Sequence, residues 1–350
     1  MSALLPLVTA VVDLVEDGAV FVALGTFPRS SRGVLIVAAV AGTIKLTGFV
    51  CMVALLLFGV LYRVSDVPQE EVNVSVEDRE ENIHQTYLAL RIAMIMLVAM
   101  LFLAILLQLW FVNGGKCWQT SISAYYFTSV RPVFVGVLCA IGACMIVYRG
   151  NTDYENTALD YSGFLAFIVA FVPTKIDEAC LPVNGPDRPE IEAAVKTNVG
   201  ALLVIGVAAT IVGLIARRLH QGQLESPSLY TVISLVVTLG VLLFGIWLYW
   251  NERNWFLDHG HLYAAVPLFI GIIVVVVANA WTAPQGTFTV WYIAVAVAMV
   301  GSLLAGGILW RVGVQHWALW LEALIILWYT VFWIVQTAEL RGAANRTQVG

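Results

Sequence analysis

Three side chains, Ser123, His261 and Glu322, have the types needed for acid–base or nucleophilic chemistry within one site. A serine hydroxyl can act as a nucleophile or polar ligand, an imidazole as a general base, and a carboxylate as a base or as the group that orients one. Glu322 is the most informative of the three, because it lies about two turns inside a strongly apolar run. A charge at the centre of such a helix costs roughly 2.5–3.5 kcal/mol, so Glu322 must be paired, protonated or in contact with water.

Two further charges lie within apolar runs. Lys45 poses the same problem as Glu322, and an ion pair between them is one solution. Such a pair could serve a relay or only hold helices together. Rival partners are three acids that share one face of an N-terminal helix: Asp13, Glu16 and Asp17. Asp160 stands near the start of another run, where the helix dipole favours a carboxylate.

The stretch Ser121–Phe134 is denser in polar and aromatic residues than a membrane protein requires. It precedes an apolar run and contains Ser121, Tyr125, Tyr126 and Arg131, which we expect to contact a substrate. The alternative is a plain helix start, in which serines cap free N–H groups and tyrosines anchor in the headgroup zone.

The histidines raise a metal hypothesis. His259 and His261 open one apolar run, and His316 precedes the run that contains Glu322. With an acid, these histidines could hold a divalent metal such as zinc, because imidazole and carboxylate are suitable ligands. Their spacing matches no established zinc signature, and histidines at a membrane interface are common.

Composition places the chain among membrane proteins. It is 60% hydrophobic and 12% charged, whereas soluble domains carry about 25% charged residues. The net charge of −5 gives no basic footprint for nucleic acid. The expected partner is the lipid bilayer, with a lipid-like substrate.

Nine apolar runs predict an all-α transmembrane bundle, since helices satisfy their own backbone hydrogen bonds in lipid. The segment Leu4–Thr26 is either a tenth span or an interfacial helix. We expect an N-terminal segment (1–85) with an acidic cytoplasmic loop, a membrane core (86–340) whose insert (175–258) adds two spans, and a tail (341–350). The runs are Val34–Tyr62, Tyr87–Val112, Pro132–Tyr148, Ala158–Val172, Val199–Ala216, Tyr230–Trp250, His261–Trp281, Thr289–Trp310 and Trp317–Gln336.

Orientation follows from basic residues and cysteines. Arginines close to the run ends, such as Arg149 and Arg341, favour a cytoplasmic C-terminus in the plasma membrane. Cys117 and Cys180 then fall in two outer loops, where a disulfide between them could form. This topology brings Ser123, His261 and Glu322 to the outer side, while Asp160 lies at the opposite end.

Several strings resemble a family of multi-pass bacterial membrane proteins, actinobacterial in type and without assigned activity. The strings are Ser-Ile-Ser-Ala-Tyr-Tyr-Phe-Thr (121–128), Val-Phe-Val-Gly-Val-Leu (133–138), Tyr-Arg-Gly (148–150), Glu-Asn (155–156), Ala-Phe-Val-Pro-Thr (170–174) and His-Leu-Tyr-Ala-Ala (261–265). The resemblance covers about 91–339 and implies a six-helix core with Glu322 as the glutamate of the last helix. Pro132 replaces the acid expected after Arg131.

A more distant resemblance is to the alkaline ceramidase and adiponectin-receptor-like superfamily, whose serine and aspartate would align with Ser123 and Asp160. Its two-histidine motif on a late helix has no counterpart in this sequence.

Three functional hypotheses follow. The first is a membrane-embedded hydrolase or transferase that acts on a lipid or envelope precursor in an outward-facing pocket. The second is a transporter or proton-coupled carrier, with Lys45, Asp160 and Glu322 along its path. The third is a non-catalytic assembly factor, in which the polar residues only hold helices together.

Overall fold

The described residues of the computed structural model form helices and the connections between them; these residues are 76–112, 117–174, 188–220, 229–284 and 286–341. The first two predicted membrane segments, Leu4–Thr26 and Val34–Tyr62, lie outside them. From Glu77 on, the described residues form one compact unit. The helices are α3 (Val76–Leu107), α4 (Arg131–Val147), α5 (Asp153–Phe171), α6 (Arg188–His220), α7 (Leu229–Asn251), α8 (Arg253–Thr282), α9 (Thr287–Val312) and α10 (Trp317–Glu339), with the short helices η1 (Gln108–Val112) and η2 (Ser123–Phe127).

The eight long helices coincide with the eight predicted apolar runs from Tyr87 onward, although several helices begin earlier than the runs. α3 begins at Val76, α6 at Arg188 and α8 at Arg253, because polar turns continue the helix beyond its apolar part. Among the described residues, five helices are long and apolar enough to cross a membrane: α3 with η1, α6, α8, α9 and α10. α4 has 17 residues, or about 26 Å of helix, which is less than the roughly 30 Å of a hydrocarbon core.

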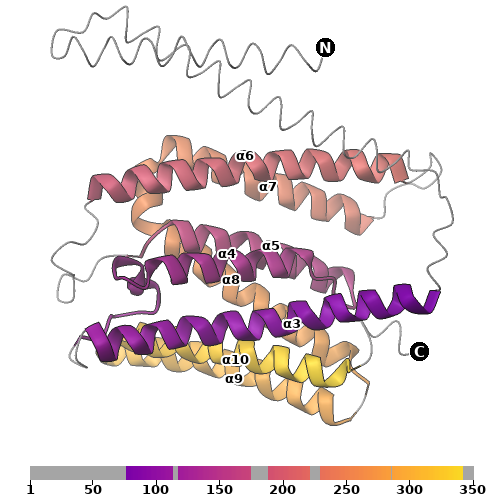
Figure 1. The fold of residues 1–350 in the computed structure, drawn as a ribbon. Coiled ribbons are helices and arrows are strands. Elements are labelled where there is room, and N and C mark those ends of the chain that lie inside the picture. Colours follow the sequence, from indigo (N-terminus) through magenta and orange to yellow (C-terminus); the bar gives the residue numbers. More distant parts are fainter. Residues whose placement is uncertain (1–75, 113–116, 175–187, 221–228, 285, 342–350) are drawn as a thin grey trace, which may run out of the picture. The chain divides into compact units, whose positions relative to one another are not determined.

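The core of the unit is built by α5, which packs against α4 on one side and α8 on another. α9 packs against both α8 and α10 (Figure 1). The contact between α4 and α5 is very close at Gly142 and Gly163, where a Cβ on either residue would lie 2.7 or 2.6 Å from the carbonyl oxygen of the other. Small residues of this kind let helix backbones approach each other in membranes.

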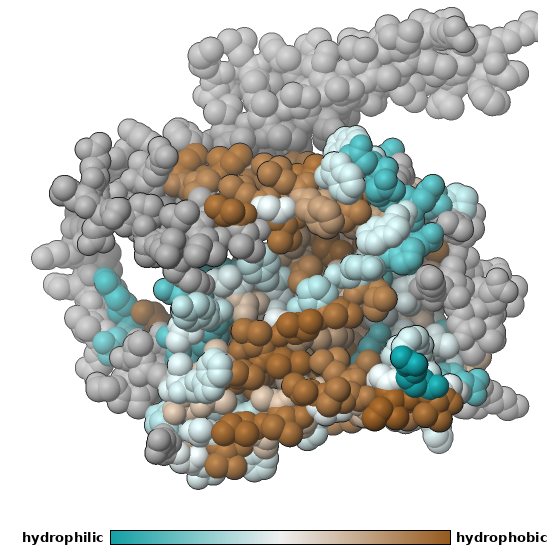
Figure 2. Space-filling view, turned by 180° about the vertical axis from the view of Figure 1, so that it is seen from behind, coloured by the Kyte–Doolittle hydropathy of each residue, from teal (hydrophilic) through white to brown (hydrophobic). Residues whose placement is uncertain are grey.

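The surface is hydrophobic to an extent unusual for soluble proteins. Figure 2 shows hydrophobic residues over a broad central area of one face, while most hydrophilic residues gather toward its two sides. The large exposed side chains include Trp110, Trp250, Trp281 and Trp310 near helix ends, as the aromatic belts of membrane proteins would place them. This surface supports a membrane protein.

Candidate functional site

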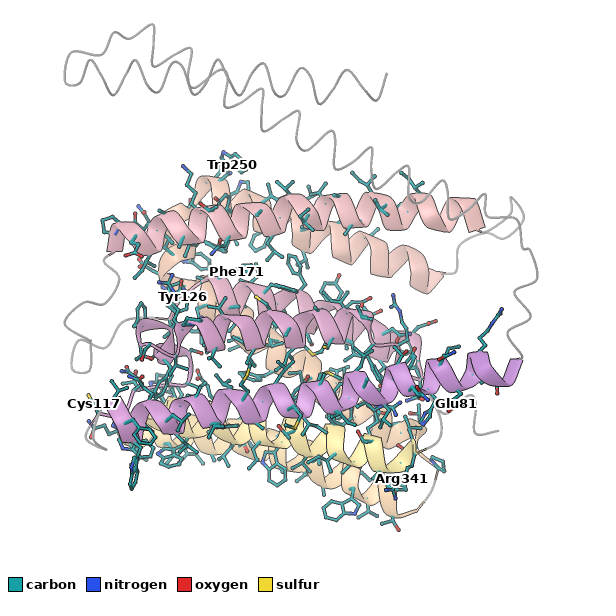
Figure 3. The ribbon with its side chains drawn as sticks, viewed as in Figure 1. Glu81, Cys117, Tyr126, Phe171, Trp250 and Arg341 are labelled. Atoms are coloured by element: carbon teal, nitrogen blue, oxygen red, sulfur yellow. The ribbon has the colours of Figure 1, made fainter. Side chains whose placement is uncertain are left out.

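The two ends of the bundle must be distinguished before its polar residues are located. Figure 3 labels Tyr126 and Cys117 at one end of the helices and Glu81 and Arg341 at the other. We call these the Tyr126 end and the Arg341 end. α4, α8 and α10 run from the Tyr126 end to the Arg341 end, and α5 runs in the opposite direction.

The serine- and tyrosine-rich stretch folds into its own 3-10 helix, η2, all five residues of which are buried. The hydroxyl of Ser121 accepts a hydrogen bond from the backbone N–H of Ala124 (2.9 Å) and so stabilises the start of η2. α4 has no side-chain cap at Val130 and begins with Arg131 and Pro132. The serines therefore do not cap α4, but Ser121 binds a backbone N–H at the start of the short helix before it, as in the alternative raised from the sequence.

Ser123 and Glu322 form the central contact of the Tyr126 end. The backbone N–H of Ser123 donates to Oε2 of Glu322 at 2.9 Å. The hydroxyl of Ser123 lies 3.3 Å from Oε1 and 3.4 Å from Oε2. The N–H can only donate, so its contact stabilises the charged form of the carboxylate, whereas the hydroxyl can donate to the carboxylate or accept from the protonated acid. The half-buried acid of α10 thus has its partner on η2, from a residue 199 positions earlier.

These two residues line one end of a largely apolar cavity of about 60 Å³ inside the bundle. Tyr329 also lines it, seven residues beyond Glu322 on α10 and thus about 10 Å along that helix. The Tyr329 hydroxyl points to the sulfur of Met94 at 3.3 Å. The remaining walls are Val98, Leu101, Ile122, Phe134, Leu138, Ile141, Met145, Ala166, Val169, Ala265, Leu268, Phe269, Ile272 and Ile326.

The other predicted binding residues lie around η2. Nη2 of Arg131 donates to the Tyr126 hydroxyl at 2.8 Å, and the guanidinium carbon lies 4.4 Å from the centre of that ring. Tyr125 is fully buried. Burial raises the pKa of its hydroxyl, and a hydrogen bond with the backbone of Gln119 opposes the shift. These side chains fix η2 against the start of α4.

The three predicted metal-binding histidines contact three different backbone carbonyls. Nδ1 of His261 lies 2.6 Å from the carbonyl oxygen of Val172, which assigns the proton to Nδ1. Nδ1 of His259 lies 3.1 Å from the carbonyl of Trp255, and Nδ1 of His316 lies 3.1 Å from that of Gln119. Within the described ranges, no group of three or more histidines, cysteines or acids is arranged to hold a metal.

His261 is buried one turn before Ala265 on α8, yet it does not line the cavity with Ser123 and Glu322. Its Nε2 atom is buried and has no hydrogen-bond partner in the described part of the chain. The structure therefore brings Ser123 and Glu322 together. His261, the third predicted catalytic residue, lies outside the cavity, one turn of α8 before the wall residue Ala265.

A second polar cluster, at the Arg341 end, was not predicted as a site. Nε of Arg91 donates to the Tyr148 hydroxyl at 3.0 Å, and this hydroxyl donates to Oε1 of Gln336 at 3.3 Å. Nε2 of Gln336 donates to Oδ1 of Asn279 (3.2 Å), whose Nδ2 donates to Oε1 of Glu155 (2.7 Å). We call these five residues the Arg91–Glu155 network.

The network is almost inaccessible to solvent and joins α3, the end of α4, α5, α8 and α10. One positive and one negative side chain stand at its two ends, so its formal charge balances. Arg91, four residues inside a predicted span, was the sequence signal for this cluster.

The remaining predicted residues lie elsewhere. Asp160 pairs with Arg149 at 3.5 Å, away from Glu322. Cys117 is disulfide-bonded, while Cys180, its predicted partner, lies outside the described residues. The same holds for Lys45, so the predicted Lys45–Glu322 ion pair stays a prediction.

Comparison of the chain with known protein families, with curated proteins and with solved structures finds no match. The two suspected resemblances therefore stay hypotheses, and the function must be argued from the site.

Proposed function

We propose that this chain is a multi-pass plasma-membrane protein that binds a lipid-like molecule in the cavity beside Glu322 and hydrolyses it or transfers a group from it. The observation that carries the proposal is the cavity itself. Its walls are apolar except for the Ser123 hydroxyl, the Glu322 carboxylate and the Tyr329 hydroxyl. The cavity is smaller than the roughly 300 Å³ of small-molecule pockets, so it would hold only a short apolar segment of the molecule, whose polar group would reach Ser123 and Glu322.

In the proposed chemistry, Glu322 is the general base. As the oxygen of a water or substrate hydroxyl forms its new bond, its proton passes to Glu322, which then returns the proton to the leaving oxygen. Ser123 holds the carboxylate in place through its N–H and hydroxyl. His261, one turn from a wall residue of the cavity, is the second candidate acid–base group.

The proposed topology has nine or ten spans with the Tyr126 end outside. Arg149 and Arg341 then lie at the cytoplasmic end, as basic residues near short loops favour. The site thus opens toward the outer leaflet, where envelope precursors are handled. Metal assistance by zinc stays a weaker hypothesis, because the three histidines contact separate carbonyls.

The test compares membrane lipids and envelope precursors of a strain lacking this chain with strains rescued by variants. Glu322→Gln keeps the shape of the side chain and removes the base, so we expect it not to restore the lipid profile, with activity lowered about 10²–10⁴-fold. Ala265→Phe fills the cavity and should fail as well, whereas Val266→Phe, an exposed neighbour on α8, should rescue.

Variant levels in the membrane must match those of the native chain for this comparison. Full rescue by Glu322→Gln would refute the catalytic role and favour an assembly factor. If the deletion strain instead accumulates an unmodified lipid on one leaflet, a carrier explains the result better than an enzyme does.

A further inference from the structure

A second cavity, of about 280 Å³, lies between α5, α6 and α7. Its walls are mostly apolar and include Phe164, Gly206, Ala209 and Leu242. Asp160 lines the same cavity. The volume is near the lower end of small-molecule pockets, which is about 300 Å³. Neither the cavity nor its charge belongs to the site beside Glu322.

The carboxylate of Asp160 is paired only loosely. Nη1 of Arg149 lies 3.5 Å from Oδ2 of Asp160, longer than the roughly 2.7–2.9 Å of a charge-assisted hydrogen bond. The Arg149 side chain is 57% exposed and that of Asp160 45% exposed. Oδ1 of Asp160 has no hydrogen-bond partner among the described residues. Both charges therefore have unused hydrogen-bonding capacity next to apolar walls.

We propose that this cavity binds a phospholipid whose zwitterionic headgroup carries a primary ammonium, as in phosphatidylethanolamine. The phosphate would contact the guanidinium of Arg149, which has five donors in a fixed fork. The ammonium would donate to the carboxylate of Asp160, and part of an acyl chain would occupy the apolar cavity.

Other headgroups fit less well. A choline headgroup carries the same charges but has no N–H to donate to Asp160. A glycerol headgroup has hydroxyl donors, but its net negative charge is not balanced by a pair of side chains that is itself neutral. The site should therefore prefer a headgroup that has both an N–H donor for Asp160 and no net charge.

The experiment uses the purified full chain and three lipids with identical acyl chains: phosphatidylethanolamine, phosphatidylcholine and phosphatidylglycerol. Native mass spectrometry measures how many molecules of each lipid remain bound. We expect the ethanolamine lipid to be preferred about tenfold over the choline lipid, as a hydrogen bond to a charged group would give. Asp160→Asn should abolish the preference, and Arg149→Gln should weaken binding of all three lipids.

Two matched controls accompany these variants. Asp153→Asn makes the same change at an exposed position of α5 and should leave the preference intact. Ala209→Trp fills the cavity and should remove the bound lipid, whereas Ala208→Trp, an exposed neighbour outside the cavity walls, should not. Ala209→Trp keeps the test decisive if Asp160→Asn fails to fold.

Equal retention of the three lipids, a preference for phosphatidylglycerol, or a preference that survives both Asp160→Asn and Ala209→Trp would overturn this assignment. The inference does not rest on the proposed function, since none of these variants alters the cavity beside Glu322.

Discussion

At the scale of single residues, the described part of the chain solves the problem of buried charge in two ways. Glu322 is held by donors that the backbone and hydroxyl of Ser123 supply. Arg91 and Glu155 are instead connected through uncharged side chains, so that neither faces lipid alone. A buried polar group without a partner costs about 1–3 kcal/mol, so each link contributes to stability as well as to any function.

Tyr148→Phe tests the Arg91–Glu155 network. The substitution keeps the aromatic ring beside Arg91, whose guanidinium carbon lies 5.5 Å from its centre. It removes the acceptor for Arg91 and the donor to Gln336, so we expect unfolding in detergent to require about 1–2 kcal/mol less free energy. Tyr263→Phe, at an exposed tyrosine of α8, should change it by less than about 0.5 kcal/mol. Equal effects would contradict a stabilising network.

The sequence predicted part of this residue-level picture. The depth of Glu322 in an apolar run correctly indicated that it needs a partner. The position of Glu322 in the sequence could not indicate that its partner is the backbone N–H of Ser123, because that donor is placed only by the folding of η2. The same rule applied to Arg91 within the run Tyr87–Val112 would have identified the second cluster.

At the scale of helices, apolar runs predicted which segments are helical but not how far each helix extends. α8 continues through Pro267 and begins before its apolar run, because a helix can add polar turns at an interface. The faces that meet could not be predicted, since an all-apolar run has no polar side to orient it. The close contact of α4 with α5 depends on two glycines that hydropathy does not distinguish from other small residues.

Gly142→Ala should separate α4 from α5. Its Cβ would lie 2.7 Å from the carbonyl oxygen of Gly163 and 3.1 Å from the ring of Phe167, so the helices must shift. We expect a loss of about 1–3 kcal/mol of stability, measured by unfolding in detergent. Gly136→Ala on the same helix meets no atom within 4 Å and should stabilise by up to about 1 kcal/mol. Destabilisation by Gly136→Ala alone would reject this explanation.

At the scale of the whole molecule, the described unit separates its polar clusters along the bundle axis. The Ser123–Glu322 contact belongs to the Tyr126 end, and the Arg91–Glu155 network belongs to the Arg341 end. The proposed function requires the first of these to face outward. The turn between α9 and α10 lies at the Tyr126 end, and the turn between α8 and α9 lies at the Arg341 end. A label on each turn therefore shows which side of the membrane that end faces.

Single cysteines at these turns test the orientation. Gln315 and Thr287 are both exposed, and neither takes part in either polar cluster. We expect Gln315→Cys to react with a membrane-impermeant maleimide in intact cells, and Thr287→Cys to react only after the membrane is opened. The native chain sets the background, and its Cys117 is already in a disulfide. Labelling of Thr287→Cys but not of Gln315→Cys in intact cells would contradict the proposed orientation. It would show that the end with Glu322 faces the cytoplasm, so that the substrate would have to come from the inner leaflet.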